Sequence, residues 1–184
     1  MKSTNSPFRK LMFILFVLGL SLGTYAQVGA WNPELENESR EAMNDMIKDA
    51  PKLQSFYDAA YGMAVFPKIT KAGLGIGGAG GKGIVYKNKE IIGSAKLRQA
   101  SFGLQAGGQQ YSEVIFFENK ESLDRFTNGN LKFDAQASAV AITEGASVDV
   151  AYQNGVAVFT RVQGGLMFEA SIGGQHFKYE PVKK

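Results

Sequence analysis

Seven of the eleven residues from 73 to 83 are glycine, and this run constrains the fold more than any other feature of the chain. Glycine is unfavourable inside helices, so the run argues against a helix here. On both sides of it, short apolar or alternating segments are separated by turn residues, as is typical of β-strands. The sequence therefore predicts a sheet that bends sharply where side chains are missing.

The strand pattern extends from residue 62 almost to the C-terminus. Asn154-Gly155 is the strongest hairpin signal, because both residues tolerate the positive φ of a type I′ turn. A short helix over residues 120–127 interrupts the strands and ends at Asn128-Gly129. The predicted strands cover residues 62–66, 72–78, 83–87, 91–98, 100–109, 111–117, 136–143, 146–152, 155–161, 165–173 and 175–180.

Helices are expected before residue 62. Asn32-Pro33-Glu34 is a helix start, and Met43, Met46 and Ile47 form an apolar stripe at helical spacing that we expect to cover the sheet. A second helix is expected over residues 51–60. The predicted fold class is α+β, with N-terminal amphipathic helices packed on a strongly curved, glycine-rich antiparallel sheet or barrel.

Residues 1–26 have the pattern of a cleavable secretory signal: a basic start, an apolar run too short to span a bilayer, and small residues at Thr24 and Ala26. We expect cleavage after Ala26 and a periplasmic or secreted protein. Because the chain has no cysteine, it has neither disulfides nor an N-terminal cysteine for lipid attachment. The expected division is a signal (1–26), a helical segment (27–50) and one α+β domain (51–184).

The formal net charge of +3 comes from the first 26 residues, and the rest of the chain is balanced. A basic pI is therefore no argument for nucleic-acid binding. The glycine run fails as a phosphate loop, since strand residues follow it where a helix would be needed. His176 is the only histidine and has no neighbour that would complete a catalytic pair. We predict no enzyme, no metal site and no cofactor.

Basic residues concentrate between residues 65 and 98, where only Glu90 opposes seven of them. If the first four predicted strands form an up-and-down meander, Lys68, Lys71, Lys87 and Lys89 occupy turns at one end. Four lysines at one end predict weak, salt-sensitive attachment to anionic lipid head groups. Alternatively, each lysine is merely solvated and protects a strand edge.

Two Gly-Gly-Gln motifs lie 66 residues apart along the chain, Gly107-Gly108-Gln109 and Gly173-Gly174-Gln175. We predict that Gly107, Gly108, Gly173 and Gly174 are structural bends. The motifs indicate either an internal repeat of two related meanders or a coincidence in a glycine-rich sequence.

Four pieces of sequence together resemble the SYLF domain family over residues 51–181. They are AYGMAVFP (60–67), the glycine-rich hairpin after it, FGLQAGGQ (102–109), and GGLMF (164–168) with Gly173 and Gly174. The resemblance implies a non-catalytic lipid-binding module, since eukaryotic members bind phosphoinositide membranes and some bind actin. This chain departs from them, because its first helix begins with acidic residues that anionic head groups would repel.

We therefore expect a secreted module that contacts phospholipid or another amphiphile, as a peripheral surface contact, with no nucleic-acid partner and no actin binding. The alternative is a structural or protein-interaction domain of the envelope, with lipid binding incidental.

Overall fold

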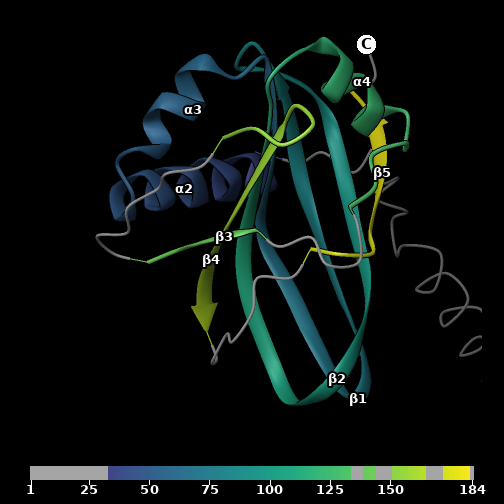
Figure 1. The fold of residues 1–184 in the computed structure, drawn as a ribbon. Coiled ribbons are helices and arrows are strands. Elements are labelled where there is room, and N and C mark those ends of the chain that lie inside the picture. The colour runs from purple at the N-terminus through teal and green to yellow at the C-terminus, as the bar shows by residue number, and fades with distance from the viewer. Residues whose placement is uncertain (1–32, 134–138, 144–150, 165–171, 183–184) are drawn as a thin grey trace, which may run out of the picture.

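A computed structural model describes residues 33–133, 139–143, 151–164 and 172–182. Its described part belongs to the predicted α+β class, with helices on both sides of a mostly antiparallel sheet (Figure 1). The helices are α2 (Pro33–Asp49), α3 (Leu53–Ala59) and α4 (Lys120–Thr127). The strands are β1 (Gly62–Lys87), β2 (Glu90–Phe117), β3 (Val140–Ile142), β4 (Val156–Gly164) and β5 (Gln175–Pro181).

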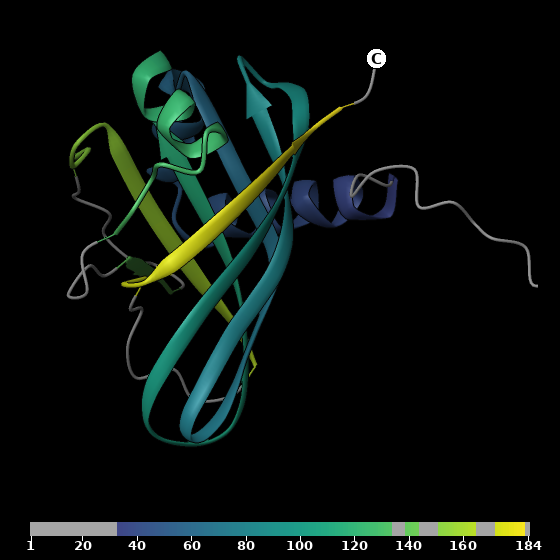
Figure 2. The same cartoon turned by 90° about the vertical axis from the view of Figure 1, so that its right-hand side faces the viewer.

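β1 and β2 form one very long antiparallel hairpin, paired from Gly62↔Phe117 to Lys87↔Glu90 with three register shifts along the ladder. Asn88 and Lys89 make its turn with φ values of 50° and 68°, as a two-residue type I′ turn requires. β4 pairs with the C-terminal part of β2 and β5 with its N-terminal part (Figure 2). β3 pairs with β4 in parallel, and among the described strands the sheet does not close.

The predicted division of residues 62–117 into six short strands is wrong. Residues 67–71, expected to form a turn, lie inside β1, and the ladder continues through the glycine run. Its register shifts lie between Phe66 and Ile69, between Gly73 and Gly75, and between Val85 and Tyr86. Glycine adopts extended backbone as readily as a turn, so the run bends a continuous strand without ending it. The predicted meander is consequently one bent hairpin.

β1 folds back so that its two halves lie against each other. A Cβ atom on Gly83 would lie 2.4 Å from the carbonyl oxygen of Val65 and 2.7 Å from Cδ1 of Phe66. A Cβ on Gly81 would lie 2.7 Å from the carbonyl oxygen of Lys68. Real Cβ contacts are longer than this, so the glycines are what allow backbone to pack directly on backbone.

Two apolar clusters hold the fold together, one on each side of β2. Alternate residues of β2 point to opposite faces, so Ile115 and Phe117 enter the inner cluster whereas Val114 and Phe116 enter the outer one. The inner cluster joins the two halves of the bent hairpin to α4, including Phe126. The outer cluster lies under α2 and α3, whose contacts include Met43, Met46 and Leu53.

Two local predictions are confirmed. α4 spans residues 120–127, and the side chain of Asn119 accepts a hydrogen bond from Ser122 N in a capping box. Asn154 and Gly155 have φ values of 51° and 75° in a two-residue turn closed between Gln153 and Val156. The secretory signal (1–26), most of the strand at 146–152 and most of that at 165–173 lie outside the described residues.

Gly83→Ala should destabilise the fold by about 2 kcal/mol or more, because its Cβ would meet backbone that cannot move aside. The matched control is Gly80→Ala in the same strand, where the atom nearest to the new Cβ would be the Leu97 carbonyl oxygen at an ordinary 3.5 Å. Urea unfolding of both variants measures the difference. Equal stability of the two would contradict the close packing of the β1 halves.

Candidate functional site

The four lysines predicted to cluster lie in two separate places. Lys87 and Lys89 lie at the hairpin turn between β1 and β2. Lys68 and Lys71 lie in the middle of β1, with the Lys68 carbonyl oxygen beside Gly81. The meander that would have brought all four to one end does not form, so only Lys87 and Lys89 are neighbours by turn geometry.

Contacts with α3 and with the segment before β1 hold these two turn lysines in place. Lys89 Nζ lies 2.9 Å from Asp58 Oδ1 and 4.8 Å from the ring centroid of Tyr57. Lys87 Nζ lies 5.5 Å from the ring centroid of Tyr61. The hydrogen bond from Lys89 lowers the pKa of the Asp58 carboxyl. Cation–π and ion-pair contacts at an exposed site are individually weak, so they position Lys89 without removing its charge from solvent.

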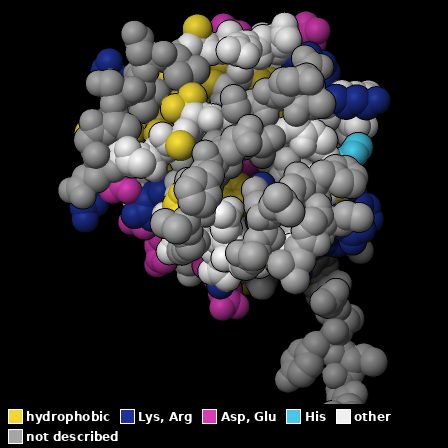
Figure 3. Space-filling view, turned by 60° about the horizontal axis from the view of Figure 1, so that its bottom comes forward, with side chains coloured by type: hydrophobic (Ala, Val, Ile, Leu, Met, Phe, Trp, Pro, Cys, Tyr) yellow, Lys and Arg dark blue, Asp and Glu magenta, His cyan; other side chains and the backbone are white. Residues whose placement is uncertain are grey.

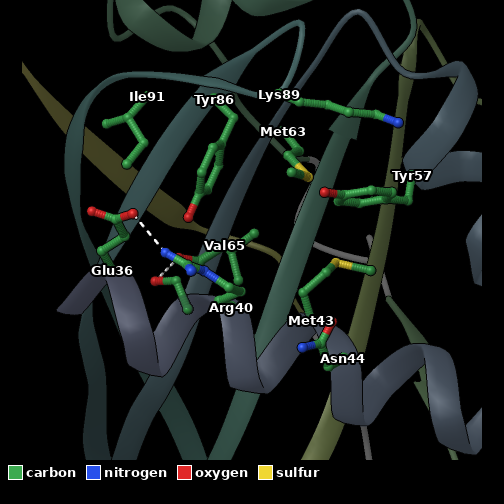
Figure 4. A pocket seen from close by; sticks show the side chains of 11 residues that line it. Glu36, Arg40, Met43, Asn44, Tyr57, Met63, Val65, Tyr86, Lys89 and Ile91 are labelled. Carbon is green, nitrogen blue, oxygen red and sulfur yellow. Dashed lines mark hydrogen bonds and ion pairs between the residues drawn. The ribbon is translucent and has the colours of Figure 1, made fainter. Parts of the chain in front are cut away.

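Lys89 lies at the edge of a cleft of about 220 Å³ between α2, α3 and the hairpin end of the sheet (Figure 4). α2 contributes one face of the cleft through residues spaced three, four or seven apart. β1 contributes from both of its halves. The lining residues are Glu36, Ser39, Arg40, Met43, Asn44, Tyr57, Met63, Val65, Tyr86, Lys89 and Ile91.

The lining divides into an apolar part and a polar rim. Met43, Met63, Val65 and Ile91 supply the apolar surface. At one end of the rim Arg40 is exposed and pairs with Glu36 at 2.7 Å, and Figure 4 shows both beside the Tyr86 hydroxyl.

Burial raises the pKa of the Tyr86 hydroxyl to about 12, and the negative charge of Glu36 adds to the shift. This hydroxyl therefore stays protonated and can donate a hydrogen bond at neutral pH.

Sequence reasoning identified Lys89 but missed the rest of the cleft. The spacing of Glu36, Arg40 and Met43 on one helix was available as a signal. The proximity of Met63 and Tyr86 gave no such signal, because these residues lie 23 positions apart in a segment that the sequence predicts to be several strands. Only the folding of β1 upon itself brings them to one cleft.

A second feature missed from sequence is a buried carboxyl group in the inner part of the sheet. Glu113 of β2 is fully buried, and Gln175 Nε2 of β5 donates a hydrogen bond to its Oε2 at 2.9 Å. Burial raises the pKa of Glu113 to about 7, which the hydrogen bond from Gln175 partly offsets. Within the described residues, no group of three or more His, Cys, Asp or Glu side chains could hold a metal ion.

The two glycine pairs predicted as bends have different conformations. Gly107 and Gly108 lie within β2, opposite Gly73 and Ala72, next to a register shift. Gly173 and Gly174 instead form the turn before β5, where Gly174 has a φ of 72°. The two motifs therefore do not occupy equivalent places in the sheet.

Comparison with known proteins supports the resemblance inferred from the sequence. Residues 98–180 match the Ysc84 family, described as "Las17-binding protein actin regulator". Beta cell expansion factor A of Aeromonas veronii is 30% identical over 156 residues, covering 79% of this chain. Residues 98–180 thus match the Ysc84 model of the SYLF family, and the chain as a whole is similar to that family. It spans 59% of the length of the Aeromonas relative.

The SYLF match maps unevenly onto the structure. Residues 98–180 contain most of β2, α4 and the three later strands, including both Glu113 and Gln175. The cleft lies outside them, since its lining residues run from Glu36 to Ile91. In the part of the chain that the structure describes, no helix combines the length and the apolar character needed to span a membrane.

Glu113 should make the stability of this domain depend on pH. Its folded pKa of about 7 exceeds its ordinary value of 4.5, so between these values the folded state holds a proton that the unfolded state has lost. The free energy of unfolding should therefore fall by up to about 3 kcal/mol as pH rises through this window.

Glu113→Gln should flatten this dependence, as measured by urea unfolding at about pH 5 and about pH 8. The conservative control is Glu118→Gln, which changes an exposed carboxyl just beyond the same strand. An unchanged pH slope in Glu113→Gln would show that this carboxyl is not the group responsible.

Proposed function

We propose that this chain is a non-enzymatic lipid-binding module that holds a single-chain anionic amphiphile in the cleft between α2, α3 and the hairpin end of the sheet. Similarity to the SYLF family suggests the lipid-binding role. The observation that carries the proposal is the composition of the cleft: an apolar part formed by Met43, Met63, Val65 and Ile91, beside a polar rim that includes two cationic side chains.

The size of the cleft favours one chain over two. Its volume of about 220 Å³ is below the range of roughly 300–1,000 Å³ that is typical of pockets for drug-sized molecules. A short alkyl chain can be accommodated against Met43 and Met63, whose flexible side chains adapt to irregular apolar shapes. A whole phospholipid would have to leave most of its surface outside.

The rim is suited to an anionic head group. Arg40 offers a planar guanidinium, which matches the geometry of a carboxylate or phosphate. Lys89 and the protonated Tyr86 hydroxyl provide further donors from the sheet side. Glu36 and Asp58 already neutralise part of this charge, so we expect modest affinity.

The location and the division of the chain belong to the same proposal. We infer that residues 1–26 are a secretory signal, that residues 27–50 form a helical segment, and that residues 51–184 form the SYLF-like domain of a periplasmic or secreted protein. The protein would then bind the amphiphile in the cell envelope, where neither actin nor nucleic acid would be a partner.

Arg40→Gln combined with Lys89→Gln should weaken the binding of dodecanoate about tenfold or more, because two rim cations are removed. Lys48→Gln with Lys52→Gln is the matched control, since these exposed lysines lie on and beside the same helices but do not line the cleft. Calorimetric titration with dodecanoate measures both.

Equal losses in the two double variants would reject the rim assignment. If dodecanoate does not bind the unaltered chain at all, the cleft proposal fails. A stoichiometric protein partner recovered from envelope extract would then favour the alternative, a protein-interaction domain.

A further inference from the structure

A second basic cluster lies on the sheet itself, away from the cleft. Lys82 of β1 is directly opposite Lys96 of β2, which is directly opposite Lys178 of β5. Two residues along, Arg98 of β2 is opposite His176 of β5. Residues opposite each other or two apart on a strand point to the same face. We call these five residues, Lys82, Lys96, Arg98, His176 and Lys178, the basic face.

The basic face points away from the protein interior. Ala95 and Leu97, which alternate with Lys96 and Arg98 along β2, are buried in the inner cluster. Lys82, Arg98, His176 and Lys178 are exposed, and Lys96 keeps 36% of its side-chain surface exposed. Figure 3 shows Lys and Arg side chains gathered beside the histidine at the right-hand edge of the molecule.

One carboxylate on this face partly offsets the positive charge. Glu180 Oε1 lies 3.0 Å from Lys96 Nζ and 3.5 Å from Lys178 Nζ. The hydrogen bond from Lys96 lowers the pKa of Glu180, so this carboxyl is ionised at neutral pH. Four lysine and arginine side chains therefore share one glutamate, and the face is net positive.

Edge protection accounts for only part of this arrangement. Lysines often protect the open edge of a sheet from pairing with other chains, and Lys82 and Lys178 lie in β1 and β5, which among the described strands are each paired with β2 alone. Lys96, however, lies in β2, which is paired on one side with β1 and on the other with β5. Like charges placed directly opposite destabilise a sheet. A row of three lysines across adjacent strands is thus a cost to the fold that a bound anionic surface would relieve.

The row also has a defined relation to the cleft. Lys82 and Tyr86 are four residues apart on β1, so their side chains leave the same face of the strand about 13 Å apart. Tyr86 lines the cleft, whereas no member of the basic face does. A flat surface in contact with the basic face would therefore pass close to the cleft.

We propose that the basic face docks the protein on an anionic phospholipid bilayer and so brings the cleft to the membrane surface. This inference rests on the proposed lipid-binding function, but the basic face is a separate site from the cleft. The row spans three strands, about 10 Å, and consists of long, exposed side chains. Several cations spread over such a surface are attracted most strongly by a partner with many negative charges over a wide area, as an anionic bilayer has.

The test compares two triple variants of the full chain for binding to vesicles of phosphatidylcholine containing phosphatidylglycerol, at low salt. Lys82→Gln, Arg98→Gln and Lys178→Gln remove three exposed cations of the basic face and leave the Lys96–Glu180 pair intact. Each cation near an anionic surface strengthens binding about fivefold, so partitioning should fall about a hundredfold.

The matched control is Lys48→Gln, Lys52→Gln and Lys132→Gln, three exposed lysines elsewhere in the described structure. It should keep most of the vesicle binding, and both variants carry the same N-terminal residues 1–26. Unchanged partitioning of the first variant, or an equal loss in the control, would overturn the proposal. Tight binding to soluble polyphosphate without vesicle binding would also overturn it and assign the face to a soluble polyanion.

Dodecanoate titration keeps this result separate from the cleft. The basic-face variant should bind dodecanoate as the unaltered chain does, because its substitutions do not line the cleft. Loss of vesicle binding with dodecanoate binding intact supports docking. If the basic-face variant loses vesicle binding but the unaltered chain does not bind dodecanoate, the proposal of an amphiphile in the cleft is wrong and the docking proposal is still supported.

Discussion

The direct packing of backbone on backbone within β1 is the contact on which the rest of the structure depends. Residues 65–69 can approach Gly81 and Gly83 only because those positions have no Cβ. This approach turns a long hairpin into two facing halves with a shared apolar interior. It also leaves the outer face of the first half free to receive α2 and α3. Without it, the two halves would not share either cluster.

The candidate sites follow from the same bend. Met63 and Tyr86 come from opposite ends of β1, yet both line the cleft, because the strand returns upon itself. Tyr61 accepts a hydrogen bond from Asn88 N through its carbonyl oxygen at 3.0 Å, which holds the two ends of the strand together. The basic face uses the other consequence of the long hairpin, that β2 has a paired strand on each side.

The sequence contained local information that was sufficient for some elements and not for others. The helix over residues 120–127 and the turn at Asn154-Gly155 depend on a few adjacent residues, and both were predicted correctly. The turn expected near Lys68 was wrong, because glycine and proline signals do not distinguish a turn from a bulge inside a long strand. The basic face was missed, because Lys96 and Lys178 become neighbours only through strand register, 82 residues apart.

The central claim is that this protein holds one anionic amphiphile in the cleft. Native mass spectrometry of the protein, purified without detergent and then incubated with a total lipid extract, tests it most directly. The account predicts a single adduct with the mass of one single-chain amphiphile, which is lost when the rim cations are removed. A spectrum that shows only the bare protein, or adducts that are unaffected by the rim, would contradict it.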